Sequence, residues 1–103
     1  MDFRLRYTQK ALKDLVEIIG YIAEDDPNAA SQFGGTLLDH IELLTRFPRM
    51  GSLVDQRPGV RKLSHSPILV YYRIRESQGV IEVLHLRHAA RQPHASKSGS
   101  TRP

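Results

Sequence analysis

The strongest constraint on the fold is the stretch of residues 67–91, which predicts a β-hairpin. Two runs rich in Val, Ile, Leu and Tyr, residues 68–74 and 80–86, flank the polar link RESQG. Such residues favour strands, and a link of three to five residues that ends in glycine is typical of a hairpin loop. We therefore expect this hairpin at the centre of a small sheet. The residues at its exit are cationic and are the first place to look for function.

The N-terminal half predicts a short strand followed by two helices. Polar and apolar residues alternate over residues 2–7, which predicts the strand. Apolar residues then recur at steps of three and four over residues 9–24, with Thr8 in the N-cap position. A second helical stripe begins at Asp26-Pro27 and ends before Pro48. The link between the two helices is so short that they must be antiparallel neighbours.

The rest of the chain completes an α+β domain. Residues 47–58 contain the loop formers Pro, Gly and Ser, and residues 59–63 predict one more strand. The order β-α-α-β-β-β predicts a single domain over residues 1–93, with an antiparallel sheet covered on one face by the helical hairpin. Residues 94–103 predict a disordered polar tail. We expect a core made of Phe3, Leu5, Leu12, Leu15, Ile19, Ile22, Phe33, Leu37, Ile41, Leu44, Val70 and Tyr72.

Charge divides the sequence into an acidic and a basic half. Residues 1–45 hold four Lys/Arg and eight Asp/Glu, whereas residues 46–103 hold eleven and three, so the halves carry −4 and +8. A basic half attracts polyanions, either nucleic acid or an acidic protein segment. The chain has no cysteine and no apolar run near the ~20 residues that span a bilayer, so we expect a cytoplasmic protein without a membrane partner.

The residue types leave few kinds of chemistry open. His85 and His88 are three residues apart, which in a strand places them on opposite faces, so we expect no metal site. The sequence lacks a phosphate-binding glycine loop and a nucleophile elbow, and we expect no cofactor. The remaining candidates are the cationic residues Arg57, Arg61, Lys62, Arg73, Arg75, His85, Arg87, His88 and Arg91.

Three interpretations of these cations remain open. RNA cleavage by 2′-OH attack would need a base, an acid and cations around the phosphorane. Capture of an acidic protein segment would use Arg–carboxylate pairs. Alternatively, the arginines only keep the outer face of the sheet soluble. Strand alternation predicts that Arg87 continues a face shared by Ile81, Val83 and His85.

An ordered set of motifs over residues 3–93 resembles the RelE/ParE toxin superfamily. Ala11-Leu12-Lys13-Asp14-Leu15 and Tyr21-Ile22 are similar to the A-x-x-D-L…Y-I pattern of the family's first helix. The resemblance continues through Pro27, Ala30, Phe33, Ile41, Leu44, Pro48, Gly51, Arg61-Lys62-Leu63, Tyr72-Arg73-Ile74 and His88-Ala89-Ala90-Arg91. It implies the same β-α-α-β-β-β fold and the toxin of a type II toxin–antitoxin pair, often called a plasmid stabilisation protein.

The resemblance also implies partners. In the superfamily an antitoxin folds over the toxin and neutralises it, and here the acidic segment expected from the charge division would be that antitoxin. The antitoxin usually brings the DNA-binding part, so operator binding is expected only of the complex. RelE-like members cut mRNA in the ribosome, whereas ParE-like members poison DNA gyrase and lack the nuclease residues.

The motifs favour the ParE-like branch. The predicted second helix has no lysine, and no tyrosine lies near the C-terminus. The A-x-x-D-L…Y-I and H-A-A-R motifs look more like ParE, which implies a gyrase poison and not an enzyme. The alternative is a RelE-like mRNA endonuclease, for which the resemblance offers Arg61, Arg73 and His88 as catalytic residues. The candidates for target or antitoxin binding are Arg61, Arg73, Arg87, His88 and Arg91.

Overall fold

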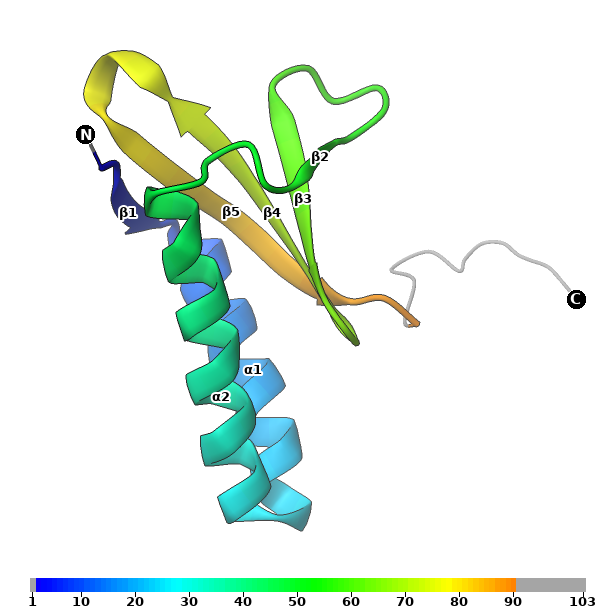
Figure 1. The fold of residues 1–103 in the computed structure, drawn as a ribbon. Helices are drawn as coiled ribbons and strands as arrows, with labels where there is room; N and C mark the ends of the chain where they lie inside the picture. Colours follow the sequence, from blue (N-terminus) through cyan, green and yellow to red (C-terminus); the bar gives the residue numbers. More distant parts are fainter. Residues whose placement is uncertain (1, 91–103) are drawn as a thin grey trace, which may run out of the picture.

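The elements follow the predicted order, with one additional short strand. The computed structural model describes residues 2–90, so Arg91 and the predicted tail over residues 94–103 lie outside the described residues. The elements are β1 (Arg4–Tyr7), α1 (Gln9–Asp25), α2 (Pro27–Glu42), β2 (Ser52–Leu53), β3 (Val60–His65), β4 (Ile68–Arg75) and β5 (Val80–His88). Figure 1 shows the two helices side by side on one face of the sheet. Across the described range, no helix combines the length and apolarity needed to cross a membrane.

The sheet is mixed, with the strand order β1-β5-β4-β3-β2. Strands β2 to β5 form an antiparallel meander, but β1 pairs with β5 in parallel, with Leu5 opposite Ile81. The prediction of an antiparallel sheet is therefore wrong for its first strand. Parallel pairing needs a long connection, and residues 8–79 supply one between these two strands. Residue alternation within a strand carries no information about the direction of its neighbour.

Both helices begin at the predicted caps. The Thr8 Oγ1 atom accepts a hydrogen bond from the Ala11 amide at 3.0 Å and donates one to the Leu84 carbonyl at 2.7 Å. The Asp26 carboxylate accepts from the Ala29 amide at 3.1 Å, with Pro27 in the first turn. These contacts satisfy backbone N–H groups that a helix start leaves without partners. The Thr8 side chain also ties the start of α1 to β5.

The second helix ends earlier than predicted, and the following loop contains a strand. α2 stops at Glu42, and residues 43–45 tighten into a 3₁₀ turn in which the Thr45 hydroxyl donates to the Glu42 carbonyl at 2.8 Å. Residues 47–58 were expected to be loop throughout, yet Ser52 pairs with Lys62 and forms β2. A strand of two residues is too short to produce a recognisable periodicity.

The predicted hairpin is confirmed as β4 and β5. Its link forms a short 3₁₀ turn over residues 76–78, and Gly79 takes the left-handed conformation with φ 65°. Glycine adopts this conformation without the steric penalty that a side chain would add. The pairing contains one β-bulge, because Tyr71 lies opposite His85 whereas Tyr72 lies opposite Val83, which leaves Leu84 without a partner.

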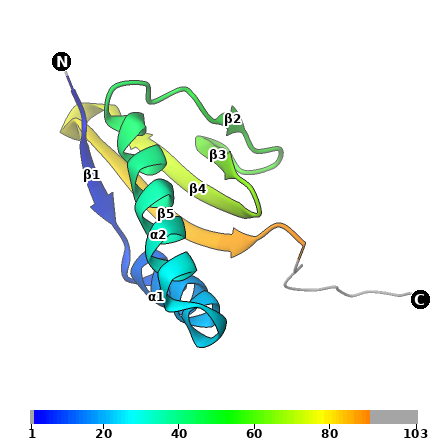
Figure 2. The same ribbon diagram turned by 60° about the horizontal axis from the view of Figure 1, so that its bottom comes forward.

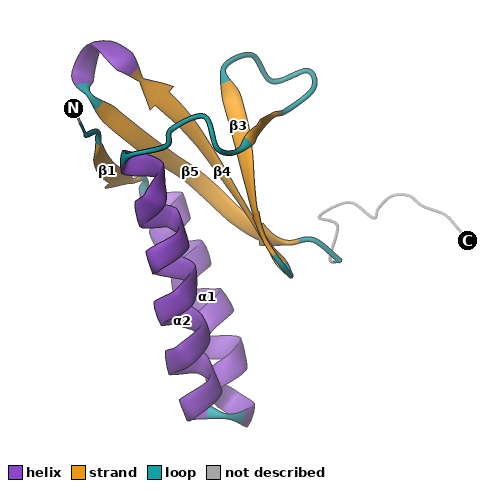
Figure 3. Cartoon of the chain, viewed as in Figure 1, coloured by secondary structure: helices purple, strands orange, loops and turns teal. Residues whose placement is uncertain are grey.

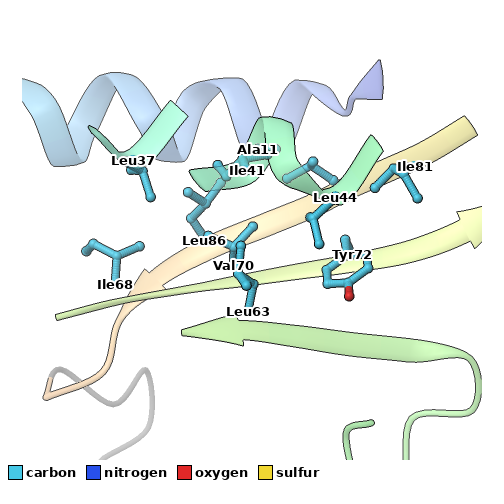
Figure 4. Packing of buried hydrophobic residues seen from close by; sticks show 11 residues of the cluster. Ala11, Leu37, Ile41, Leu44, Leu63, Ile68, Val70, Tyr72, Ile81 and Leu86 are labelled. Atoms are coloured by element: carbon cyan, nitrogen blue, oxygen red, sulfur yellow. The ribbon is translucent and has the colours of Figure 1, made fainter. Parts of the chain in front are cut away.

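The hydrophobic core fills the space between the helical hairpin and the sheet. Figure 4 shows that the buried side chains of both layers point toward one another. Five predicted core residues are buried as expected, namely Leu37, Ile41, Leu44, Val70 and Tyr72. Six others are only partly buried at the margin of the core, namely Phe3, Leu5, Leu15, Ile19, Ile22 and Phe33.

The prediction that Leu12 is buried is wrong, because α1 is turned further about its axis than its apolar stripe indicates. The Leu12 side chain is 50% exposed, whereas Ala11 and Asp14 face the sheet. The Asp14 carboxylate accepts a hydrogen bond from the Leu86 amide at 2.9 Å and one from the Lys10 ammonium at 2.6 Å. A buried carboxylate is stable when such donors surround it. Counting apolar residues assigns Asp14 to the solvent and so misplaces the buried face.

Candidate functional site

One face of the sheet is free of helices and carries most of the cations. Figure 2 shows both helices on the same side of β3, β4 and β5. Residues directly opposite each other in neighbouring strands share a face. Lys62 lies opposite Tyr71, which lies opposite His85, and all three point away from the core. We call this helix-free side the open face.

An aromatic pair and two arginines form a cluster on the open face. The rings of Tyr71 and His85 are stacked, with centroids 4.4 Å apart and planes 13° from parallel. The guanidinium carbons of Arg57 and Arg87 lie 5.6 and 5.8 Å from the centroid of the Tyr71 ring. Figure 3 shows the loop between β2 and β3, which supplies Arg57. We call these four residues the Tyr71 cluster.

Hydrogen bonds within the Tyr71 cluster indicate which of its side chains are charged. The Arg87 Nε atom donates to the Tyr71 hydroxyl at 3.2 Å, and the Arg57 Nη1 atom lies 3.0 Å from the His85 Nε2 atom. A guanidinium group can only donate, so His85 Nε2 must be the unprotonated acceptor. Burial lowers the pKa of His85, and the positive charge of Arg57 lowers it further. At neutral pH the positive charge of the cluster therefore resides on the two arginines.

The structure places Arg61 and Arg73 on different faces of the sheet. Arg61 lies opposite the buried Tyr72 in the neighbouring strand, and its Nη1 atom donates to the Gly51 carbonyl at 2.7 Å. This contact holds the loop that precedes β2. Arg73 lies on the open face, opposite Val60 and Glu82, and its buried Nε atom has no hydrogen-bond partner in the described part of the chain. The two residues therefore do not form one site.

Arg87 and His88 also lie on different faces of the sheet. The expectation that Arg87 shares a face with His85 is confirmed, but the expectation that it shares one with Ile81 and Val83 is wrong, because the bulge at Leu84 shifts the alternation of β5. Ile81 and Val83 enter the core, whereas the half-buried Arg87 joins the open face. His88 lies opposite the buried Ile68 and therefore faces the helix side. The nuclease candidates Arg61, Arg73 and His88 are thus not brought together.

A cavity of about 470 Å³ lies on the helix side, where α1 meets the ends of β4 and β5. Its lining combines apolar and charged side chains, among them Ile18, Phe33, Ile68, Lys10, Glu17 and His88. Cavities of this kind bind apolar groups and fix their orientation through a few polar contacts. The geometry suits an apolar side chain of a protein partner whose backbone runs along the charged rim.

A second pair of histidines joins α2 to the sheet. The Nδ1 atoms of His40 and His65 are 2.8 Å apart, and the ring of Phe33 packs edge-on against His65. One imidazole must donate and the other accept, so at least one of them is neutral at this position. Burial lowers the pKa of His65, and the neighbouring His40 lowers it further. His40 therefore packs against the His65 ring, with ring centroids 5.0 Å apart.

We expect the free energy of unfolding to fall as the pH is lowered from about 7.5 to 5.5. The folded state depresses the pKa values of His65 and His85, so the unfolded chain binds more protons below the unperturbed histidine pKa of 6.5. Urea unfolding at the two pH values measures this loss. In the His65→Gln variant the same pH change should reduce stability less. An equal loss in the variant would show that other groups cause the acid sensitivity.

Sequence reasoning placed Arg57 and His85 among the cations but missed Tyr71. One signal was present, because Tyr71 and Tyr72 are adjacent in a strand and only one of them can face the core. The stack itself depends on the bulge that brings His85 opposite Tyr71, and no local pattern indicates a bulge.

Comparison with known proteins supports one family. Residues 5–93 match the family described as ParE toxin of the type II toxin–antitoxin system parDE. Protein Y4kP of Sinorhizobium fredii, a proposed toxin, is 34% identical over 88 residues, which cover 80% of this chain and 86% of that protein.

Solved structures share the fold at lower sequence identity. A structure from the chromosomal ParDE system of P. aeruginosa is 23% identical with a TM-score of 0.70, covering 84% of this chain and 95% of its own. The RelBE2 complex of Mycobacterium tuberculosis is 20% identical with a TM-score of 0.61, over 85% and 99%. Isolated E. coli RelE is 20% identical with a TM-score of 0.57, over 93% and 94%. The fold is therefore common to ParE and RelE toxins, and by its family match the chain belongs to the ParE toxins of type II toxin–antitoxin systems.

Proposed function

We propose that this toxin inhibits DNA gyrase and is not a nuclease. The observation that carries the proposal is the separation of Arg61, Arg73 and His88, which lie on two faces of the sheet. Ribonuclease chemistry needs a proton-transferring group beside the cations that stabilise the phosphorane. The residues offered for that role do not meet this condition. The match of residues 5–93 to the ParE family supports the same conclusion.

The proposed partner is an antitoxin with an acidic segment. The sheet half of the sequence carries +8, and the cavity on the helix side adds an apolar site next to it. Both features suit an extended polypeptide that offers carboxylates and a few apolar anchors. The structural neighbours from P. aeruginosa and M. tuberculosis are described as toxin–antitoxin systems or complexes. Sequence-specific binding of operator DNA is expected only of the complex, through the antitoxin.

One observation favours the alternative function, a ribosome-dependent mRNA endonuclease. His85 is neutral at pH 7 and lies between Arg57 and Arg87 on the open face. A neutral imidazole is a suitable general base next to a bound phosphate once Arg57 turns from its Nε2 atom to the phosphate. The alternative therefore depends on His85, with the two arginines as the cations.

The deciding experiment assays the purified chain against gyrase and against ribosome-bound mRNA in parallel. We expect inhibition of supercoiling with accumulation of cleaved DNA, and intact mRNA. Replacement of Arg87 and Arg91 by Ala should abolish growth arrest because it removes two cations at the hairpin exit. Lys13→Ala is the matched control, since it removes one exposed charge from α1.

A result opposite to the expected one would identify the alternative function. Cleavage of ribosome-bound mRNA with unaffected gyrase would establish the alternative, and loss of that cleavage in His85→Gln or His88→Gln would identify the base. Circular dichroism of each variant confirms that the fold is retained. Co-expression with the neighbouring reading frame tests the antitoxin separately, because a cognate pair should remain associated through purification.

A further inference from the structure

Some cations of the open face form an ion pair with a carboxylate and others do not. Arg6 and Arg75 both pair with Glu82, at 3.4 and 3.0 Å. In contrast, Arg57, Lys62, Arg73 and Arg87 form no ion pair with any carboxylate among residues 2–90. Arg57 and Arg87 converge on the Tyr71 ring, and Lys62 lies opposite Tyr71 in the neighbouring strand. A group of like charges with no anion between them repels itself unless a ligand supplies the negative charge.

The two arginines are held in fixed orientations. Arg87 donates through Nε to the Tyr71 hydroxyl and through Nη1 to the His88 carbonyl, at 3.2 and 3.4 Å. His85 accepts from Arg57 Nη1. In both arginines the Nη2 group makes no hydrogen bond within the described structure and so keeps its donors for a ligand. Fixed donors lose less conformational entropy on binding than flexible ones do. The Tyr71 cluster is therefore prepared for an oxyanion.

We propose that the Tyr71 cluster and Lys62 bind the phosphate backbone of DNA, independently of base sequence. In its biological setting the inference rests on the proposed function, because the DNA in question is the DNA held by gyrase. Guanidinium groups bind phosphate through paired N–H donors, and the partly exposed His85 ring offers a surface on which a sugar or a base can stack. The contacts reach phosphates only, so they confer no sequence preference.

The composition of the open face favours nucleic acid over an acidic protein. Protein interfaces place large apolar side chains at their centre, whereas DNA interfaces are polar and strongly cationic. The exposed large apolar residues of the described chain are Leu12, Val16, Tyr21, Leu38, Leu43, Phe47, Met50 and Leu53. None of them belongs to β3, β4 or β5. The apolar anchors that a protein partner needs therefore lie on other surfaces, and the open face offers mainly charge.

The test measures binding of the purified chain to a fluorescently labelled 20-base-pair DNA by anisotropy, between 50 and 200 mM NaCl. Three phosphate contacts predict a slope of about −2.7 for log K against log salt concentration. The double variant Arg57→Ala, Arg87→Ala should weaken binding at least tenfold at 50 mM NaCl and reduce the slope by about 2. Lys13→Ala on α1 should change the affinity less than about twofold, because the removed charge lies on the opposite side of the molecule. Thermal melts confirm that each variant is folded.

Several outcomes would overturn the inference. These are no binding at 50 mM NaCl, an equal loss in Lys13→Ala, tighter binding of RNA of the same sequence, or equally effective competition by polyglutamate. The last two would assign the cluster to RNA or to an acidic protein. The gyrase assay is a separate experiment, so the two proposals can fail independently. A chain that inhibits gyrase without binding DNA contradicts this inference alone, and one that binds DNA without affecting gyrase contradicts the gyrase assignment alone.

Discussion

Replacing Gly51 by Ala is expected to lower the free energy of unfolding by about 3 kcal/mol, which in a domain of this size lowers Tm by roughly 15 °C. A Cβ atom at this position would lie 2.6 Å from the Lys62 carbonyl oxygen and 2.8 Å from the Tyr72 hydroxyl oxygen. Neither atom can retreat easily, because the carbonyl belongs to β3 and Tyr72 is completely buried. The same hydroxyl accepts from the Gly51 amide at 3.0 Å and donates to the Pro48 carbonyl at 2.6 Å.

Gly35→Ala is the matched control for this substitution. A Cβ atom at Gly35 would meet no heavy atom within 4 Å, and the residue lies inside α2. Alanine is favoured over glycine in a helix by up to about 1 kcal/mol, so this variant should be more stable than the parent chain. Urea unfolding of both variants measures the difference. A Gly51→Ala variant as stable as the parent would mean that the loop moves away from Tyr72 without penalty.

Replacing Asp14 by Ala is expected to destabilise the fold by about 2 kcal/mol. The substitution leaves the Leu86 amide buried without its acceptor, and an unsatisfied buried donor costs roughly 1–3 kcal/mol. The packing of α1 against β5 depends on the same contact. Unfolding in urea gives the magnitude, and hydrogen exchange at the Leu86 amide should accelerate specifically.

Two further variants separate the contribution of the Asp14–Leu86 hydrogen bond to stability from that of the Lys10–Asp14 ion pair. Asp14→Asn keeps an oxygen acceptor near the Leu86 amide and should be less harmful than Asp14→Ala. Lys10→Ala removes the ammonium group, whose side chain is 65% exposed, and an ion pair whose cation stays largely in water contributes little. If Lys10→Ala were as destabilising as Asp14→Ala, the ion pair and not the backbone hydrogen bond would hold the helix to the sheet.

Much of the fold follows from local patterns in the sequence. The caps at Thr8 and Asp26, and the hairpin loop ending at Gly79, were predictable because each depends on residues within one turn. The errors have a common origin in distant contacts. Leu12 is exposed because Asp14 is drawn inward by an amide 72 positions away, and β1 is parallel because its partner is the last strand.

The candidate site was only partly predictable for the same reason. Its cations were evident from the sequence, but their grouping depends on the bulge at Leu84 and on the register between three strands. Without the bulge, His85 would not lie opposite Tyr71, and Arg87 would not join the open face. Arg57 reaches His85 from a loop 28 positions earlier, a contact that no periodicity encodes.

The parallel pairing of β1 with β5 determines when the toxin first exists as a folded molecule. Among the described residues, the first strand pairs only with residues 80–83, and the Asp14 carboxylate of the first helix accepts its backbone hydrogen bond from the Leu86 amide. Contacts that close loops of more than 70 residues form late and slowly. A growing chain shorter than about 86 residues therefore lacks the partner that holds its N-terminal strand and helix in place. Toxicity should arise only after Leu86 has been synthesised, which gives an antitoxin made at the same time the opportunity to bind each molecule as it folds.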